Sequence, residues 1–311
     1  MALIKRVPAN LGIDFLGKRV LFLVFSALLL VVAIGSFALQ GLNLGVDFRG
    51  GILIELKTKG PADIGELRDR ISGLGIDGAT IQAFGAPDDV LINLPAQGDG
   101  PAETQAVIEQ IRTAFTDVAE EYRRVEFVGP KVGDELREAG ALATVLALLG
   151  IAAYIWFRFE WHFAAAALIA LFHDVIATVG FFALTQIEFN LATLAAVLTI
   201  AGYSINDTVV VFDRVREDLR KYKKASMPVL LNAALNSTLT RTALTSLTTL
   251  LALIALYLFG GEVIRGFTAG LIWGVVIGTY SSIGIAAPLL VYFGLRRSDV
   301  AVAEEGQAAK S

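Results

Sequence analysis

Cysteine is absent from this sequence of 311 residues, which excludes disulfides, thiolate nucleophiles and cysteine-ligated metal sites. No GxxxxGK(S/T) phosphate loop occurs either, so a nucleotide bound by such a loop is not the energy source on this chain. Charged residues make up only 18% of the sequence, and the net charge of −4 gives no argument for a nucleic-acid partner. We therefore expect no enzyme activity, no metal and no cofactor.

Apolar residues dominate what is present. They make up 55% of the sequence, and the mean hydropathy is +0.64. The charged residues gather in 1–19, 47–137 and 212–224, which leaves long uncharged stretches between them. This distribution indicates a membrane protein with one soluble part.

The first apolar run, residues 20–39, is long enough for one membrane-spanning helix. Basic residues are concentrated in the 1–19 segment before it, so this tail is predicted to be cytoplasmic. A cleaved signal peptide is the competing interpretation. We reject it because the apolar run exceeds the usual signal-peptide core and further spans follow.

Residues 40–137 contain the soluble part, which is predicted to be extracytoplasmic. Its core, 47–128, alternates strand and helix patterns in the order β-α-β-β-α-β, which is typical of the ferredoxin-like fold. Ala86-Pro87-Asp88 is predicted to be the turn of the central hairpin. The predicted elements span residues 51–57, 61–73, 79–85, 89–95, 102–115 and 122–128.

The apolar positions of these elements predict one small core. The domain has no histidine or cysteine with which to build a metal site. The predicted core residues are Ile52, Ile54, Leu67, Ile71, Ile81, Ile92, Ile108, Ile111 and Phe115.

Five further spans are predicted within 138–295, which makes six in total. The basic loop 213–224 is predicted to be cytoplasmic and could also contact anionic lipid headgroups. Arg296 and Arg297 follow the last span, so the C-terminal tail, 296–311, is cytoplasmic as well. The fold class is thus a helical polytopic membrane protein with an inserted α+β domain.

Asn206 and Asp207 interrupt an apolar stretch, 189–217, that could otherwise span a bilayer. A charge near the bilayer interior costs at least ~2.5 kcal/mol, so Asp207 is a functional-site hypothesis. The alternative is that Asp207 only ends a shorter helix at the membrane surface. The apolar run continues through Phe212, which favours the functional interpretation.

Arg241 and Thr245 lie on one polar stripe of the fifth span. Counted from the midpoints of their helices, Asp207 and Arg241 share a depth to within about 2 Å. Antiparallel helices could therefore pair these charges. Arg241 could instead extend to the cytoplasmic surface, as long cationic side chains near helix ends do.

Two further sets of residues stand out within the predicted spans. His173 and Asp174 lie in the middle of the third span, which favours a role in a functional or polar network. Gly270, Gly274 and Gly278 recur at fourfold spacing in the sixth span, where small residues allow another helix to approach closely.

Several ordered motifs together resemble the SecD/SecF family of bacterial protein-export subunits, and in particular its SecF members. The resemblance covers nearly the whole chain. The motifs are GVDFRGG at 45–51, VGPKVGDEL at 128–136, HDV at 173–175, GYSINDTVVVFDRVRE at 202–217, RTALTS at 241–246 and YLFGG at 257–261.

This resemblance implies a periplasmic domain between the first two of six helices in the bacterial inner membrane. It implies a partner, SecD, and a pair that resembles resistance-nodulation-division pumps and uses the proton gradient. It further implies that the pair assists export of preproteins through the SecYEG channel. By motif match, the proton-coupling residues are Asp207 and Arg241, and His173, Asp174 and Asn206 belong to matching motifs.

The residues alone leave three functions open. The chain could be half of an ion-coupled transporter, half of a small-molecule exporter of similar architecture, or a structural membrane subunit whose charges only fix helix register. Proton conduction that disappears on Asp207→Asn would separate the first two from the third.

Overall fold

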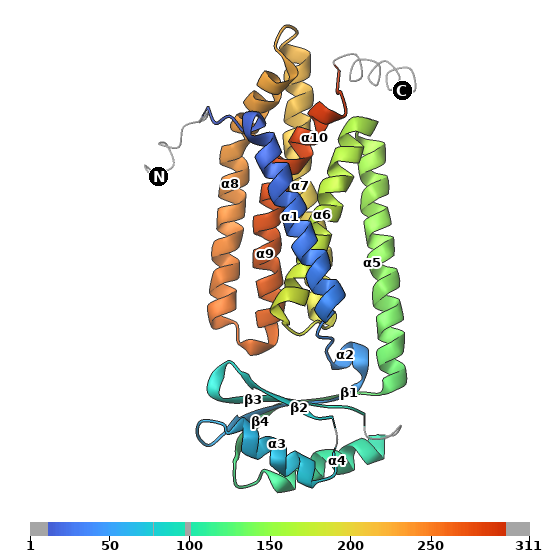
Figure 1. The fold of residues 1–311 in the computed structure, drawn as a ribbon, viewed down its shortest axis with the longest axis vertical. Helices are drawn as coiled ribbons and strands as arrows, with labels where there is room; N and C mark the ends of the chain where they lie inside the picture. The colour runs from blue at the N-terminus through green and yellow to red at the C-terminus, as the bar shows by residue number, and fades with distance from the viewer. Residues whose placement is uncertain (1–11, 77, 97–100, 297–311) are drawn as a thin grey trace. The chain divides into compact units, whose positions relative to one another are not determined.

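Figure 1 shows the computed structural model of the chain, which describes residues 12–76, 78–96 and 101–296. The chain forms two compact units. One holds the long helices and is built from the chain up to Leu42, Thr144–Ile187 and the chain from Ala192 onward. The other, called the module below, consists of Asn43–Ala143 and Glu188–Leu191. Of the predicted tails, 1–11 and 297–311 lie outside the described residues.

Six segments in the described residues are long and apolar enough to cross a membrane. The predicted fold class, a six-helix membrane protein with a small sheet domain, is thereby confirmed. The last segment changes from α-helix to a π-helical turn, η4 (Ser282–Ala286), before it ends. The segments are α1 (Arg19–Gln40, preceded by the 3-10 turn Leu16–Lys18), α5 (Pro130–Arg158), α6 (Trp161–Thr185), α7 (Leu191–Lys221), α8 (Met227–Phe259), and α9 (Arg265–Ser281) with η4 and α10 (Ala287–Tyr292).

The helices divide into inner and outer ones. In α6, α7 and α9, half or more of the apolar span is buried, whereas less than a fifth is buried in α1, α5 and α8. In an aromatic cluster, the Phe212 ring of α7 packs against the Phe163 ring of α6 at 5.1 Å and against the ring of Phe159, in the turn before α6, at 5.9 Å. The outer helices therefore present their apolar faces to lipid or to another protein.

The module contains a four-stranded antiparallel sheet with the order β2-β3-β1-β4, as the ferredoxin-like prediction requires. All nine predicted core residues lie in one buried cluster of the module, so the predicted core is confirmed. A short helix, α2 (Val46–Arg49), precedes the sheet. The elements are β1 (Gly51–Thr58), α3 (Ile64–Gly73), β2 (Thr80–Phe84), β3 (Ala86–Leu94), α4 (Pro101–Ala114) and β4 (Ala119–Val128).

The predicted hairpin turn is wrong. Ala86, Pro87 and Asp88 belong to β3, and the chain reverses at Gly85 alone, whose φ is +82°. Glycine adopts this positive φ without the strain that other residues would have. Gly85 alone therefore makes the reversal that was predicted for Ala86-Pro87-Asp88. Pro87 is tolerated in the strand because it pairs with neither β1 nor β2.

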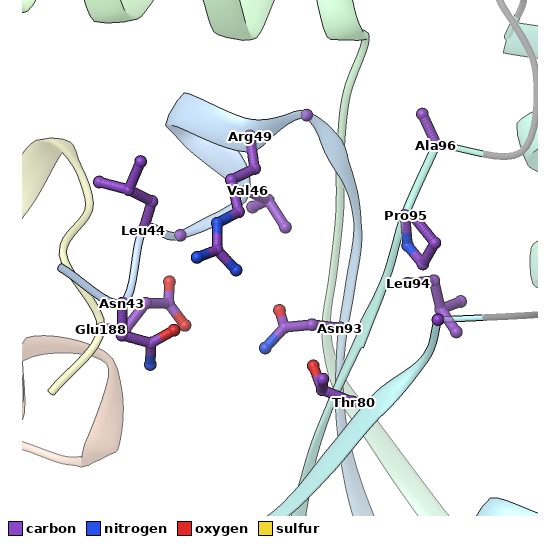
Figure 2. Close-up of a pocket in the computed structure, with 13 residues that line it drawn as sticks. Asn43, Leu44, Val46, Arg49, Thr80, Asn93, Leu94, Pro95, Ala96 and Glu188 are labelled. Atoms are coloured by element: carbon purple, nitrogen blue, oxygen red, sulfur yellow. The ribbon is translucent and has the colours of Figure 1, made fainter. Parts of the chain in front are cut away.

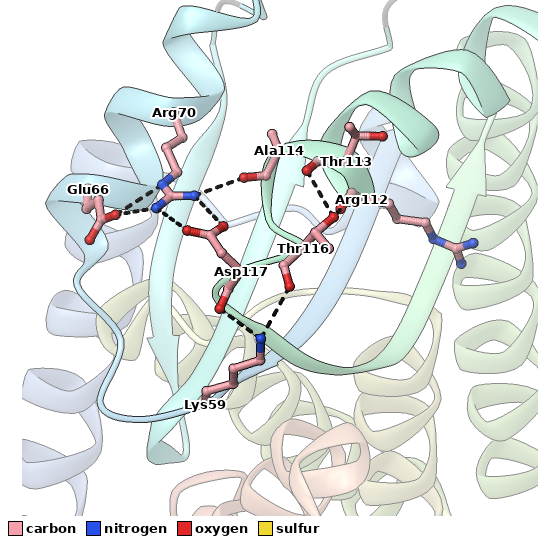
Figure 3. Close-up of polar contacts among 8 residues, drawn as sticks. All are labelled: Lys59, Glu66, Arg70, Arg112, Thr113, Ala114, Thr116 and Asp117. Carbon is pink, nitrogen blue, oxygen red and sulfur yellow. Dashed lines mark hydrogen bonds and ion pairs between the residues drawn. The ribbon is translucent and has the colours of Figure 1, made fainter.

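An ionic network joins α3 to the end of α4 and the turn that follows it (Figure 3). Arg70 of α3 donates hydrogen bonds to both carboxylate oxygens of Asp117, at 2.7 and 2.9 Å, and to the carbonyl of Ala114 at 3.0 Å. It also donates to Glu66, one turn earlier on α3, at 2.6 Å. Lys59 donates to the Asp117 carbonyl at 2.9 Å. These bonds hold α3 against the turn that follows α4.

Candidate functional site

Asp207 lies one residue beyond the midpoint of α7 and does not end that helix, which continues to Lys221. Its side chain is only 3% exposed, and its Oδ2 atom has no hydrogen-bond partner within the described residues. The next residue, Thr208, is also buried, with an unpartnered Oγ1 atom. A buried polar atom without a partner costs free energy, so Asp207 and Thr208 lower the stability of this part of α7 in the described structure.

Arg241 lies on α8 and is exposed. No ion pair joins it to Asp207 within the described residues. Thr245 donates its hydroxyl to the carbonyl of Arg241 at 3.0 Å and so satisfies itself within its own helix. Arg241 is thus a charge on the face of a membrane-crossing segment, which requires another protein or an aqueous cavity around it.

Asn206 is exposed, unlike its neighbour Asp207. Successive residues on an α-helix point about 100° apart, so adjacent residues face different surroundings. The structure therefore places Asn206 away from the buried side of α7.

A second polar cluster surrounds Asp174, which is completely buried in α6. The His173 Nδ1 atom lies 2.8 Å from one oxygen of the Asp174 carboxylate. The other oxygen accepts hydrogen bonds from the hydroxyls of Ser204 on α7, at 2.5 Å, and Ser281 on α9, at 2.6 Å. Three helices of the interior thus converge on one carboxyl group.

The cluster continues through His173 towards α1. The Nε2 atom of this buried histidine has no partner within the described residues, and its ring lies 6.4 Å from that of Tyr280. The Tyr280 hydroxyl donates to the Phe22 carbonyl at 2.6 Å and lies 2.8 Å from the Ser26 hydroxyl. The π-helical turn η4 follows immediately after Ser281, and such turns are frequent at functional sites.

Sequence analysis did not identify Ser204 and Ser281 as members of this cluster. Ser204 precedes Asp207 by three residues, so both lie on the same face of α7. That spacing was a usable signal, because a small polar residue beside an intramembrane carboxylate is a candidate hydrogen-bond donor. Ser281 gave no comparable signal, because nothing in the sequence places α9 beside α6.

Three glycines of α9 lie at its closest approach to the inner helices. An added Cβ atom at Gly270 would come within 2.7 Å of the Phe182 ring, and one at Gly278 within 3.1 Å of the Ser204 Cβ atom. At Gly274, it would collide with Ile200 of α7. The glycines therefore allow the backbone contact that positions Ser204 and Ser281 around Asp174.

Within the described residues, no group of three or more histidine, aspartate or glutamate side chains could hold a metal ion. The described site offers two carboxyl groups, a histidine, an arginine and several hydroxyls. These groups can bind, hold and pass on protons.

Two protein families match the chain. Residues 107–296 match the family described as "Protein export membrane protein SecD/SecF, C-terminal", and residues 35–62 match the "SecD/SecF GG Motif". The first match alone covers more than half of the chain and includes Asp174, Asp207 and Arg241.

Full-length relatives carry the same description. A protein translocase subunit SecF from Rickettsia felis is 42% identical over 304 residues, which are 97% of this chain and 98% of that protein. The SecF subunit of Pseudomonas aeruginosa is 44% identical and covers 93% of this chain and 94% of its own. A protein translocase subunit SecDF from Brucella abortus is 42% identical over 99% of this chain, which spans only 41% of that longer protein.

A solved structure shares the fold. The crystal structure of SecDF from Thermus thermophilus, a translocon-associated membrane protein, superposes with a TM-score of 0.84 at 34% identity. The match covers 95% of this chain and 40% of that one. The chain therefore belongs to the SecD/SecF family of protein-export membrane proteins, and within that family to the SecF subunits of the protein translocase.

Proposed function

We propose that the chain works with SecD to couple the proton gradient to preprotein export through the SecYEG channel. The observation that carries this proposal is the Asp207 carboxyl group, which is buried in the middle of α7 with an oxygen that lacks a partner. A carboxyl group in that position is a proton-binding group at the depth of a membrane span. Its burial within a helix that continues beyond it argues against a role as a helix end.

We propose that Arg241 and Asp207 together form a switch that binds and releases a proton. A guanidinium group remains charged at all physiological pH values, so only its distance from Asp207 needs to change. When the two groups approach, the ionised carboxylate is favoured, and when they separate, the protonated form is favoured. A helix rearrangement that alters this distance would therefore bind and release a proton.

SecD is the partner that the fused SecDF relatives indicate. Arg241 lies on α8, one of the three outer helices, whose apolar span is hardly buried within this chain. We expect SecD to cover the face of α8 that carries Arg241, because an arginine in contact with hydrocarbon is costly.

The Asp174 cluster is proposed as a second part of the proton path. Ser204 links it to α7 one turn before Asp207, and the unpartnered Nε2 atom of His173 leaves the cluster able to exchange a further hydrogen bond. Asn206 and Thr245 have weaker support, since Asn206 is exposed and the Thr245 hydroxyl is satisfied within α8.

We place the protein in the inner membrane with both termini in the cytoplasm. This orientation rests on the basic loop 213–224 and on the basic flanks of the first and last spans. It makes the module periplasmic, where it would meet a preprotein that emerges from SecYEG.

Export into inverted membrane vesicles tests the proposal. The protein is supplied with SecD and SecYEG, and export is measured with and without a proton gradient. Asp207→Asn should assemble normally, because the side chain keeps its shape, yet lose the stimulation that the gradient gives. Asp213→Asn is the matched control, since Asp213 lies on the same helix but is only half-buried and is paired with Arg158 at 3.0 Å. Full stimulation with Asp207→Asn at equal abundance would leave only the structural role.

A further inference from the structure

Two segments of the module that are far apart in the sequence are bonded to each other. The backbone N–H of Phe189 donates to the Asn43 carbonyl at 2.7 Å, and that of Gly45 donates to the Phe189 carbonyl at 2.9 Å. Leu44 and Phe189 thus form a short parallel bridge. The Phe48 and Phe189 rings stack at 6.1 Å, and both side chains are buried. We call residues 43–51 and 188–191 together the clasp.

Asp47 completes the clasp at the start of a helix. Its Oδ2 atom accepts a hydrogen bond of 2.8 Å from the N–H of Leu191, the first residue of α7. The first N–H groups of a helix lack partners within that helix, and a negative charge there is favoured by the helix dipole. Asp47 therefore both satisfies and positions the beginning of α7.

The glycines of the GVDFRGG motif make this close contact possible. An added Cβ atom at Gly45 would lie 2.5 Å from an oxygen of Glu188, and one at Gly50 would lie 2.9 Å from the Cα atom of Pro130, where α5 begins. Gly51 has a φ of +124°, a conformation that strains other residues, and opens β1. The clasp thus joins the starts of two long helices to the first strand of the sheet.

Figure 2 shows a pocket that is lined in part by residues of the clasp. Asn43, Arg49 and Glu188 form one side of a pocket of about 400 Å³, and Thr80 and Asn93 of the β2–β3 hairpin form the other. The clasp meets the sheet at β1, which begins with Gly51 of the clasp, and through Val46, which packs in a small buried cluster with Leu53 of β1 and Leu91 of β3. β1 is hydrogen-bonded to both β3 and β4, so a displacement of its first residue acts on the sheet as a whole.

We propose that the clasp transmits movement of α7, the helix that carries Asp207, to the sheet of the module, with Asp47 as the positioning residue. Leu191 and Asp207 belong to one uninterrupted helix, so a displacement that accompanies protonation at Asp207 reaches the clasp along the helix axis. The clasp stays closed throughout the cycle and acts as a rigid link. This inference rests on the proposed function and adds the element that connects proton binding to the periplasmic work.

The test measures proton conduction and the stimulation of export by the proton gradient separately. In vesicles that contain the chain, SecD and SecYEG, Asp47→Ala should retain proton conduction but lose gradient-dependent stimulation of export. Asp207→Asn should lose both, so failure of the clasp and failure of the proposed function give different results. Asp47→Asn keeps a side-chain oxygen that can accept from Leu191, and it should restore most of the stimulation that Asp47→Ala loses.

Asp63→Ala is the matched control. Asp63 also caps a helix with its carboxylate, accepting hydrogen bonds from Gly65 and Glu66 at 2.9 and 3.1 Å, but its helix, α3, lies wholly within the module. Loss of this cap should leave both conduction and stimulation intact. If Asp47→Ala stimulates export as well as the wild type does at equal abundance, or loses conduction together with stimulation, the clasp is not the transmitter.

A disulfide provides a second test that does not depend on how well Asp47→Ala folds. The chain contains no cysteine, so Leu44→Cys together with Phe189→Cys allows a single cross-link across the parallel bridge. A rigid link should tolerate this cross-link, and stimulation should be equal under oxidising and reducing conditions. Loss of stimulation on oxidation, with recovery on reduction, would show that the clasp must open and would overturn the proposal.

Discussion

Ser204 on α7 donates a hydrogen bond of 2.5 Å to Asp174 on α6, and it does so from a position one turn before Asp207. The bond connects two buried carboxyl groups, those of Asp174 and Asp207, through one side chain and one helical turn. Any change in the position of α7 would therefore act on the hydrogen bonds of Asp174.

Ser204→Ala should weaken both the structure and the coupling. It removes one of the donors to a buried carboxyl group, a loss that costs about 1–3 kcal/mol of unfolding free energy. We expect a lower unfolding temperature of the purified protein and slower proton conduction, with both restored by Ser204→Thr. Ser237→Ala is the control, because that hydroxyl donates only to Ala234 of its own helix, and it should change neither quantity. Normal conduction by Ser204→Ala would show that the link between the clusters is not used.

Gly274→Ala should disturb the contact between α9 and α7. The new Cβ atom would collide with Ile200, and overpacking of this kind costs about 1–3 kcal/mol. We expect less folded protein in the membrane and a lower unfolding temperature in detergent. Gly150→Ala on α5 has open space around its Cβ position and should behave like the wild type. Equal stability of the two variants would mean that α9 can move away from Ile200 of α7 with no loss of unfolding free energy.

The stability of the module should depend on pH through Asp117. The hydrogen bonds from Arg70 hold the pKa of Asp117 below its ordinary value of 3.8. The stability that this ionised pair contributes is fully present above 3.8, and it is lost as the pH falls through the lower pKa of the folded module. Residues 43–129 have their own core, so we expect them to fold when expressed alone. Urea unfolding should show Asp117→Asn to be less stable than the wild type at pH 7, with the difference shrinking below pH 3.8. A difference that is constant with pH would contradict the assignment.

Much of the module could be predicted because its strands alternate apolar and polar residues. In β1, Ile54 and Leu56 alternate with Glu55 and Lys57, and the burial of these two apolar side chains agrees with that pattern. The hairpin could not be placed as well, because one glycine with a positive φ replaces a longer turn. In the sequence, Gly85 does not stand out from Ala86, Pro87 and Asp88, which also favour a turn.

The polar site was only partly predictable. Asp207 stands out because a charge within an apolar run is costly, and its burial agrees with that reasoning. The hydrogen bonds to Asp174 depend on which helices are neighbours, and periodicity within one helix does not report its neighbours. The contact of Asp47 with Leu191 was missed for the same reason, since it joins residues separated by 144 positions.

The orientation in the membrane has a direct test, motivated by the basic loop 213–224. A reporter that is active only outside the cytoplasm should work when it is fused after Lys59, in the module, and fail when it is fused after Lys224. A cytoplasmic reporter should show the reverse. Activity of the external reporter at Lys224 would refute the six-span topology with internal termini.

Proton flux through purified protein tests the central claim most directly. The chain and SecD are reconstituted into vesicles with an imposed pH difference, and the internal pH is followed with a fluorescent indicator. The wild type should conduct protons, Asp207→Asn should reduce the flux to that of protein-free vesicles, and Asp213→Asn should conduct normally. Equal flux in Asp207→Asn and the wild type would contradict the account, because the Asp207 carboxyl group would then carry no protons.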